Sequence, residues 1–325
     1  MGTEAYKYLF ILENEKSNPA NINKTGNKEY IFTRRHDPVI NSIGFNITQG
    51  RLGNALYVTR KMANMYLQSN GLPINPQTWN YTKVDDEYKN RDNRMNNQLM
   101  VPGQTYWGTN GGRIDWSGNA AEIANASHRN FMPQTGTGYF PHKWCSERDG
   151  VPTGMEAYDF PVIRYAEVLL NYAEAAVEVG KTNEAFDMLK QIRKRAGINE
   201  TSSNPEMKGK VYGLNPNMNQ TEMREAVREE RFIELLFEQK RLWDMRRWMI
   251  YDKLMNGQGK RHALVMNKQA DNTYTTYLFD RDNTPMITNQ NIYFLSMKRS
   301  EMSNNPNLEQ TKGWENGTFD PQAGL

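Results

Sequence analysis

Cysteine and histidine are scarce in this sequence, and their scarcity excludes several classes of protein. Cys145 is the single cysteine, so no disulfide can form within the chain, and four histidines are spread over 325 residues. Structural zinc sites need cysteine and histidine clustered at short spacing, and the sequence contains no such cluster. We therefore exclude a disulfide-stabilised scaffold and a zinc finger, and we expect neither a metal site nor a bound cofactor.

The chain also has little net charge and no long apolar run. Lysine and arginine number 40 against 37 aspartates and glutamates, which leaves a formal charge of +3. Proteins that bind nucleic acid concentrate positive charge on one face, so we expect no nucleic-acid partner. No stretch is apolar over the length that a membrane-spanning helix needs. Residues 1–6 do not form a signal peptide and resemble the middle of a helix, so we expect the chain to be a piece of a longer protein.

Motifs for nucleotide and acyl-transfer chemistry are missing as well. The sequence has no Walker loop, no G-x-S-x-G and no dinucleotide-binding glycine motif in a strand context. The carboxylates Asp115, Glu122 and Glu147 stand in no arrangement typical of a glycosidase. We therefore expect a protein that is not an enzyme.

Aromatic residues, in contrast, are plentiful. The 7 tryptophans, 17 tyrosines and 12 phenylalanines make up 11% of the chain, too many for a disordered protein. Residues 71–155 hold most of the tryptophans and show no sustained helical or strand period, and a loop region of that length is usually functional. Aromatic faces can stack on the C–H face of a pyranose ring, while Asn, Asp and Arg side chains hydrogen-bond to hydroxyl groups.

The sequence therefore predicts a sugar-binding face in this segment. The candidate ligand-binding residues are Trp79, Tyr81, Tyr106, Trp107, Asn110, Arg113, Asp115 and Trp116. Trp144 belongs to the same group of loop tryptophans. The alternative for each of these rings is that it anchors a loop to the helices.

Apolar residues return at helical spacing after residue 160. They predict one helix from Val162 to Gly180 and a second from Asn183 to Ala196, joined as an antiparallel hairpin. Small residues at Ala173 and Ala185 allow a close crossing and match the core positions of a tetratricopeptide repeat. Because one hairpin cannot bury both of its faces, we expect it to pack on further helices.

A third, longer helix is predicted from Asn219, with Glu222 completing a capping box, to about Met249. Glu230, Glu234 and Glu238 would lie on one face of it, where like charges repel. Carboxylate metal sites usually add a histidine three residues after a glutamate, and none is present. We expect a structural ion-pair network with arginines of the same helix or of the hairpin, namely Arg231, Arg241, Arg246, Arg247, Arg193 and Arg195.

Other elements are shorter. The spacing predicts helices near residues 6–12 and 53–69 and strands at 29–33 and 274–279. Within 241–248 we expect Trp243 to pack, with Arg247 stacked on its indole, rather than to contact phosphate or RNA. We expect each histidine to be a surface or loop residue: His36, His128, His142 and His262.

Several segments, taken together, resemble the SusD/RagB family. The likeness spans about residues 5–316 and rests most on three later motifs. These motifs are FPVIRYAEVLLNYAEA at 160–175, ERFIELLFE with RLWDMRRW at 230–248, and NPNL before GW at 305–314. Two earlier segments, 27–32 and 91–95, fit the same order.

The resemblance implies a mainly α fold of tetratricopeptide-like units with a loop-rich ligand face. Residues 1–325 would form one region, with the ligand face at 71–155, the helices at 160–250 and an irregular segment at 251–325. Family members are surface lipoproteins of Bacteroidetes, held on the outer membrane by an N-terminal lipid anchor. We expect that anchor to lie outside this chain. They bind oligosaccharides, sometimes peptides, without catalysis, and deliver them to a SusC-like TonB-dependent transporter. The alternative is a helical-repeat adaptor that binds a protein or peptide partner in a groove.

Overall fold

The computed structural model of this chain describes residues 5–44, 58–76, 87–99, 113–115, 128–130, 139, 141–146, 155–200, 202–257, 262–268, 274–280, 285–288, 290–318 and 320. For the strands at 113–115, 128–130, 262–268 and 274–280 it describes the backbone alone. The chain divides into two compact units. The first comprises Met1–Leu236 and Arg261–Arg281, and the second Phe237–Lys260 and Asp282–Leu325.

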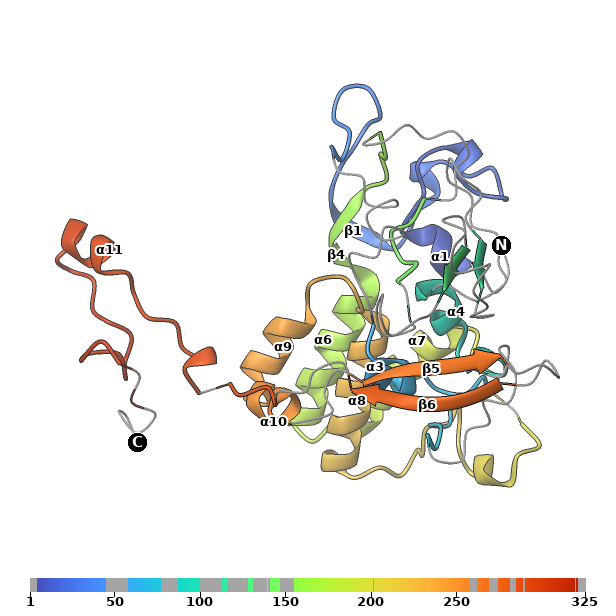
Figure 1. The fold of residues 1–325 in the computed structure, drawn as a ribbon. Coiled ribbons are helices and arrows are strands. Elements are labelled where there is room, and N and C mark those ends of the chain that lie inside the picture. The colour runs from blue at the N-terminus through green and yellow to red at the C-terminus, as the bar shows by residue number, and fades with distance from the viewer. Residues whose placement is uncertain are drawn as a thin grey trace. The chain divides into compact units, whose positions relative to one another are not determined.

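Three helices form the centre of the first unit (Figure 1). Helices α6 (Tyr165–Glu178) and α7 (Thr182–Arg195) are the predicted antiparallel hairpin, and α8 (Gln220–Glu234) packs on both. Ala173 and Ala185 are fully buried at the crossing, as their small size requires. Gly180 ends α6 with a positive φ of 77°, and the amides of Gly180 and Lys181 reach back to carbonyls of the last turn. The mainly α fold and the hairpin are confirmed.

Helix α8 begins where the sequence predicts but ends earlier. The Asn219 side chain accepts from the amides of Thr221 and Glu222, and Glu222 accepts in turn from the Asn219 amide, so the capping box is present. The helix stops at Glu234, and a new helix, α9, begins at Arg241. Between them Phe237 and Gln239 adopt positive φ. The prediction of one helix to Met249 was wrong, because helical periodicity continues across a break that tertiary contacts stabilise.

Side chains from distant segments satisfy the carbonyls that the break leaves open. Tyr6 and Arg164 both donate to the carbonyl of Glu234, at 2.7 and 2.8 Å. Gln98 donates to the carbonyl of Ile233 and Lys143 to that of Leu236. The last carbonyls of a helix have no partners within the helix, so these four side chains serve as its C-terminal cap.

A two-stranded antiparallel sheet precedes α6. Strand β1 (Tyr30–Arg34) pairs with β4 (Phe160–Arg164), which confirms the strand predicted at 29–33. Val162 and Ile163 therefore lie in a strand, and the prediction that α6 begins at Val162 was wrong. Glu29 sets the true start: its carbonyl accepts from the amide of Tyr165 and its carboxylate from that of Ala166.

The remaining elements of the first unit are short. They are α1 (Ala5–Leu9), the 3-10 helices η2 (Glu15–Ser17) and η3 (Lys24–Gly26), α3 (Arg60–Met65), α4 (Asn93–Gln98) and η5 (Pro205–Met207), the parallel pair β2 (Arg113–Asp115) and β3 (His128–Asn130), and the hairpin of β5 (His262–Lys268) and β6 (Tyr274–Asp280). The strand predicted at 274–279 is confirmed, and α3 covers the centre of the helix predicted at 53–69. None of the helices described could cross a membrane, because each is too short or too polar.

The second unit contains α9 (Arg241–Arg247), α10 (Tyr251–Met255), the 3-10 helix η6 (Gln290–Ile292) and α11 (Arg299–Asn304). The Asn256 side chain holds Thr288 beside α10. Trp243 is 60% exposed, so the prediction that it packs was wrong. Its cation partner is Arg246, at 5.3 Å from the ring centroid, whereas Arg247 stacks on Trp248.

Candidate functional site

The predicted ligand-binding residues fall mostly outside the part of the chain that the structure describes. Those outside the described residues are Trp79, Tyr81, Tyr106, Trp107, Asn110 and Trp116. Arg113 and Asp115 are described by their backbone, as the two ends of β2, which pairs in parallel with β3. The sugar-binding face therefore stays a prediction.

Trp144 is described, and it is a core residue. Its side chain is 3% exposed and lies between Phe10, Tyr158 and Phe160, with ring centroids 5.1 to 5.9 Å apart. Tyr158 donates to its backbone carbonyl. Of the two alternatives for the loop tryptophans, the second holds for this ring, which anchors its loop. The neighbouring His142 is also buried, so it is a loop residue but not a surface residue.

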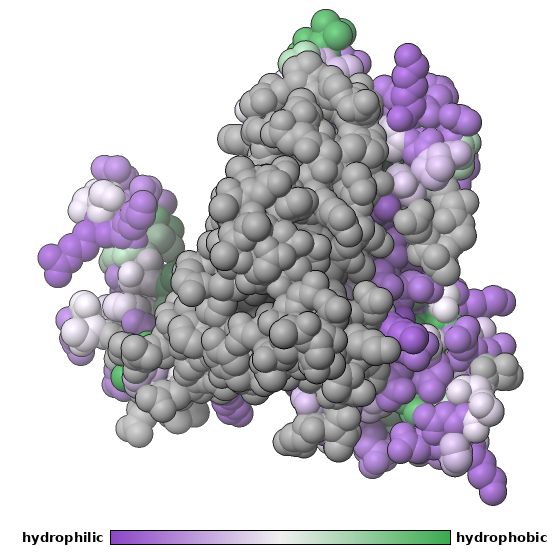
Figure 2. Space-filling model, turned by 45° about the vertical axis from the view of Figure 1, so that its right-hand side comes forward, coloured by the Kyte–Doolittle hydropathy of each residue, from purple (hydrophilic) through white to green (hydrophobic). Residues whose placement is uncertain are grey.

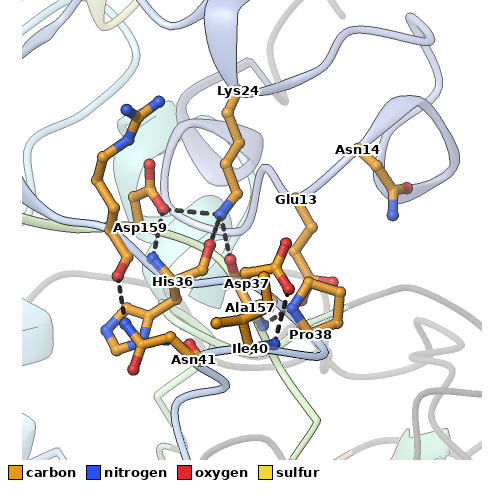
Figure 3. A pocket seen from close by; sticks show the side chains of 11 residues that line it. Glu13, Asn14, Lys24, His36, Asp37, Pro38, Ile40, Asn41, Ala157 and Asp159 are labelled. Atoms are coloured by element: carbon orange, nitrogen blue, oxygen red, sulfur yellow. Dashed lines mark hydrogen bonds and ion pairs between the residues drawn. The ribbon is translucent and has the colours of Figure 1, made fainter.

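A cleft of 640 Å³ opens elsewhere in the first unit, between the N-terminal segment and the chain that precedes β4 (Figure 3). Ligand sites for small molecules are commonly of this volume. Most of the residues that line it have polar side chains, although much of the lining surface is apolar; they are Glu13, Asn14, Lys24, Arg35, His36, Asp37, Pro38, Ile40, Asn41, Ala157 and Asp159.

Lys24 holds this cleft together. Its ammonium group donates to the carboxylate of Asp159 at 2.7 Å and to the carbonyls of His36 and Ala157. An ammonium has three hydrogen-bond donors, so these three acceptors saturate it. Asp159 in turn accepts from the amide of His36 at 2.9 Å. Figure 3 shows Lys24 reaching from η3 into this group of acceptors. The ammonium is a tether between two chain segments and is not available to a ligand.

The tether fixes one end of a loop, residues 36–41, that forms one wall of the cleft. Asp37 pairs with Asn41 through two backbone hydrogen bonds, and its carboxylate accepts from the amides of Val39 and Ile40. These two amides lower the pKa of Asp37 below its ordinary value, so the carboxylate is ionised at neutral pH. The loop is therefore held by hydrogen bonds within itself although it lies at the surface.

The tip of this loop is apolar. Val39 is 85% and Ile40 90% exposed, and Ile40 is also one of the residues that line the cleft. Figure 2 shows a hydrophobic patch at the top of the first unit, where the blue loop lies in Figure 1. The loop thus presents two apolar side chains to solvent next to the cleft.

A second cleft, of 440 Å³, lies beside the first and shares Lys24, Arg35 and Asp159 with it. Strand β1 supplies much of its lining, including Ile31 and Phe32, each 60% exposed. The two clefts together place polar side chains between two sets of exposed apolar residues.

Little in the sequence indicates either cleft. His36 is a loop residue, as predicted, and its ring Nδ1 lies 3.2 Å from the carbonyl of Asn41. The available signal was the run of asparagines. Asn14, Asn18 and Asn23 accept backbone amides and so shape this part of the chain.

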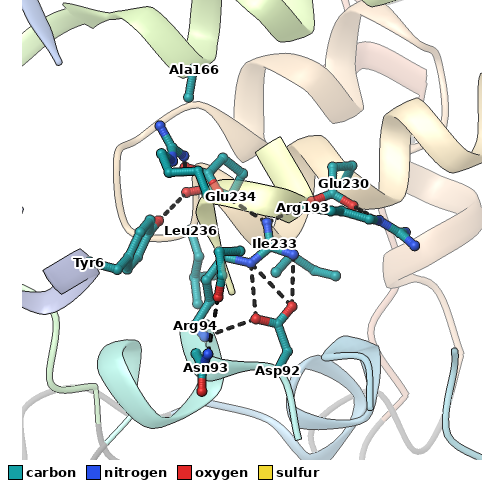
Figure 4. A network of polar contacts seen from close by, with 12 residues as sticks. Tyr6, Asp92, Asn93, Arg94, Ala166, Arg193, Glu230, Ile233, Glu234 and Leu236 are labelled. Atoms are coloured by element: carbon teal, nitrogen blue, oxygen red, sulfur yellow. Dashed lines mark hydrogen bonds and ion pairs between the residues drawn. The ribbon is translucent and has the colours of Figure 1, made fainter. Parts of the chain in front are cut away.

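The predicted ion-pair network is present, and it is buried (Figure 4). Glu230 contacts Arg94 at 2.6 Å and Arg193 at 2.7 Å. Glu234 contacts Arg94 at 3.0 Å and Arg164 at 2.8 Å, and also pairs with Arg195. Arg193 and Arg195 were predicted partners, whereas Arg94 and Arg164 were missed because they lie far away in the sequence. Glu238 lies beyond the end of α8 and is not on the same helix face.

The network keeps its carboxylates ionised. Burial alone would raise the pKa of Glu234, but the charges of Arg195, Arg164 and Arg94 outweigh it and hold the pKa well below the ordinary value of 4.5. Arg94 and Arg193 do the same for Glu230. Carboxylates with lowered pKa values that are fully paired with arginines are poor proton donors and poor metal ligands. Among the described residues, no group of three or more His, Cys, Asp or Glu could hold a metal ion.

The fold and sequence match proteins that are already known. A model of the SusD family matches residues 11–314. The SusD-like protein P2 of Formosa agariphila is 30% identical over 145 residues, which are 44% of this chain and 25% of that protein. A SusD-like protein from Bacteroides fragilis has a similar fold, with a TM-score of 0.64 and 21% identity over 95% of this chain and 57% of its own.

A second solved structure from Bacteroides fragilis, described as a SusD-like carbohydrate binding protein, matches with a TM-score of 0.57 and 21% identity. The match covers 95% of this chain and 61% of that protein. The matched stretches thus cover between 25% and 61% of the length of these relatives. Because the family model matches most of the sequence and the solved members share its fold, this chain belongs to the SusD family.

Proposed function

We propose that this chain is part of a protein that captures oligosaccharides at the cell surface and delivers them to a TonB-dependent outer-membrane transporter. The observation that carries the proposal is membership of the SusD family, together with the fold shared with a SusD-like carbohydrate binding protein. In this proposal the protein is held on the outer membrane and catalyses no reaction.

The residues of the chain support sugar binding in two ways. The segment 71–155 combines Trp and Tyr with Asn, Asp and Arg, which is the mixture that a shallow sugar site needs. The buried ion-pair network supplies a rigid frame for loops, because α4, β4, α7 and α8 all contribute charged side chains to it. Its paired, ionised carboxylates do not resemble the acid and base of a glycosidase, one of which needs a raised pKa.

Replacement of Trp107 and Trp116 tests the proposal. We expect Trp107→Ala and Trp116→Ala each to weaken retention of the protein in a native gel that contains its polysaccharide. Trp243→Ala is the matched control, since Trp243 is an exposed tryptophan outside the segment 71–155. Gels with neutral and acidic polysaccharides, followed by a hydrolysis assay, identify the ligand class and check for turnover.

The outcomes separate the possibilities. Retention of the parent and of Trp243→Ala, with loss in the two other variants and no hydrolysis, supports the proposal. Hydrolysis of the retained polysaccharide would show an enzyme. Retention that is equal in all four proteins would show that the sugar binds elsewhere.

The alternative is an adaptor that binds a protein or peptide, and one observation favours it. Helix α6 exposes the apolar side chains of Tyr165, Val168 and Tyr172, and Val179 directly after the helix is exposed as well. Helical repeats bind partners on such faces. A parent protein that binds no polysaccharide but binds a peptide, and loses the peptide in Val168→Asp, would favour the adaptor.

A further inference from the structure

Four asparagines in the sequence are followed directly by glycine. The structure describes Asn70, Asn256 and Asn316, whereas Asn110 lies outside the described residues. An asparagine in this position can lose its side-chain amide without an enzyme. The backbone nitrogen of the glycine attacks the side-chain carbonyl carbon of the asparagine, and ammonia leaves with the proton of that nitrogen. Glycine favours the attack because it has no Cβ to hinder the approach. The product is a cyclic succinimide.

Water then opens the succinimide at either of its two carbonyl groups. One opening gives aspartate, and the other gives isoaspartate, in which the backbone continues through the former side chain. Both products carry a carboxylate where the asparagine carried a neutral amide, so each adds one negative charge. The side chain and the backbone amide must approach each other, so hydrogen bonds that hold either group slow the reaction.

Asn256 is held against this reaction on both sides. Its side-chain oxygen accepts from the amide and the hydroxyl of Thr288, at 2.6 and 2.7 Å, and its side-chain nitrogen donates to the Thr288 carbonyl at 3.0 Å. The attacking group would be the amide of Gly257, which donates to the carbonyl of Met286 at 2.9 Å. These hydrogen bonds would have to break before the ring could close.

Asn70 is held as well, and it is also buried. It is 8% exposed, and its side-chain oxygen accepts from the amide of Leu72 at 3.1 Å. The amide of Gly71 donates to the carbonyl of Gln68 at 2.9 Å. A Cβ on Gly71 would lie 2.0 Å from the carbonyl oxygen of Tyr212, which shows how closely the backbone is packed here. Asn70 is therefore restrained by hydrogen bonds and by packing.

Asn316 differs from both. It is exposed, and its side chain has no hydrogen-bond partner among the described residues. Gly317 is exposed too, and a Cβ on it would meet no described atom within 4 Å. The restraint recorded for this glycine is one backbone hydrogen bond, from its amide to the carbonyl of Trp314 at 3.0 Å. A single hydrogen bond in an exposed turn opens easily, since little packing holds it closed.

We propose that Asn316 is a site of spontaneous deamidation, and that the fold protects Asn256 and Asn70 from the same reaction. The inference does not depend on the sugar-binding function proposed above. It concerns a turn in the second unit, directly after the glycine and tryptophan of the last sequence motif.

The modification would change a turn that holds two segments together. The indole nitrogen of Trp314 donates to the carbonyl of Phe294 at 2.9 Å. Isoaspartate at position 316 would lengthen the backbone between Trp314 and the amide of Gly317, so the hydrogen bond that closes the turn would be lost. The new carboxylate would also lie next to Glu315 in the sequence, where like charges repel.

The three asparagines can be compared in one sample of the parent protein. The protein is incubated at mildly alkaline pH, which speeds the reaction because the attacking nitrogen must lose its proton. Digestion with trypsin at intervals places each asparagine in a separate peptide, and mass spectrometry measures the amide lost from each. A parallel incubation in urea gives the three rates without the fold.

A pair of glycine variants completes the experiment. Gly317→Ala adds a Cβ at the attacking residue and should slow the loss of the Asn316 amide. Gly209→Ala is the matched control, because Gly209 is also exposed, has a positive φ of 75° and follows a lysine. This variant should leave the rate at Asn316 unchanged.

We expect Asn316 in the folded parent to lose its amide at least about tenfold faster than Asn256 and Asn70, because those residues must break more hydrogen bonds to react. In urea the three rates should become similar. If Asn316 reacts no faster than the other two in the folded protein, the inference is overturned. A difference of the same size that persists in urea would overturn it as well, since local sequence and not the fold would then protect Asn256 and Asn70. Neither result bears on sugar binding.

Discussion

Arg94 and Glu230 are joined at 2.6 Å between Nη1 and Oε1, although 136 residues separate them in the chain. Both side chains are fully buried. Arg94 also contacts Asp92 and Glu234, and these carboxylates outweigh the effect of burial and raise its pKa well above the ordinary value. This one guanidinium therefore connects α4 to α8, and a buried charge left without partners is costly.

Loss of Arg94 should destabilise the fold strongly. We expect Arg94→Met to lower the free energy of unfolding by about 3 to 5 kcal/mol, because it leaves Glu230 and Glu234 short of a counter-charge in the interior. Urea denaturation followed by circular dichroism measures the change. Arg224→Met is the control: Arg224 pairs with Glu178, whose side chain is 50% exposed, and its replacement should change stability little. Equal losses in both variants would contradict this account.

Glu234 should make stability depend on pH. Its pKa is lower in the folded chain than its ordinary value of 4.5, so the unfolded chain takes up the proton first as the pH falls. The stabilisation by Glu234 is therefore complete above about pH 5 and decreases below it. Glu234→Gln should be less stable at pH 7 and show a shallower loss of stability between about pH 5 and pH 3. Denaturation midpoints over this range test the prediction, and parallel curves for the two proteins would refute it.

Trp144 should matter for stability, in contrast to an exposed tryptophan. We expect Trp144→Ala to destabilise the first unit by about 3 to 5 kcal/mol, since it removes a ring buried against Phe10, Tyr158 and Phe160. Trp243→Ala removes a ring that is 60% exposed and should cost far less. Thermal unfolding of both variants makes the comparison. A larger effect for Trp243 would show that it is covered in the folded protein.

Gly213 and Gly180 should differ in their tolerance of a side chain. Both have positive φ, of 77°, so alanine is strained at either position. A Cβ on Gly213 would also lie 2.2 Å from the backbone of Gly71, whereas one on Gly180 would meet nothing within 4 Å. We expect Gly180→Ala to cost about 1 to 2 kcal/mol and Gly213→Ala clearly more. The melting temperatures of the two variants measure this difference in stability. Similar values would mean that the backbone near Gly71 can move to make room for the Cβ.

The sequence predicted well what local periodicity determines. The hairpin of α6 and α7, the cap at Asn219 and the strands β1 and β6 all follow from spacing or from capping residues. The predictions were wrong where contacts between distant segments determine the local structure. The spacing of Val162 and Ile163 also fits a helix and so predicts one there. These residues form strand β4 instead, because they pair with β1.

The candidate site shows the same division. Pairing of Glu230 and Glu234 with arginines was predictable, since repeated carboxylates on one face need cations. The clefts were not, because Lys24 meets its partners 12 to 135 residues away. Trp144 could not be told from a ligand-facing ring, since its burial depends on the packing of Phe10 and Tyr158 around it.

The termination of α8 has a consequence for redesign of this protein. Residues 235–240, which follow the end of the helix at Glu234, contain no glycine or proline. From the sequence alone, one would therefore expect strong helix formers at these positions to stabilise the protein. In a continuous helix the backbone carbonyls of residues 233–236 would accept hydrogen bonds from amides of the helix itself. The side chains that now donate to these carbonyls would lose their acceptors; they are Tyr6, Gln98, Lys143 and Arg164. Four segments of the chain that are far apart in the sequence would lose their shared hydrogen-bond acceptors at once, so the lengthened helix would destabilise the packing around it.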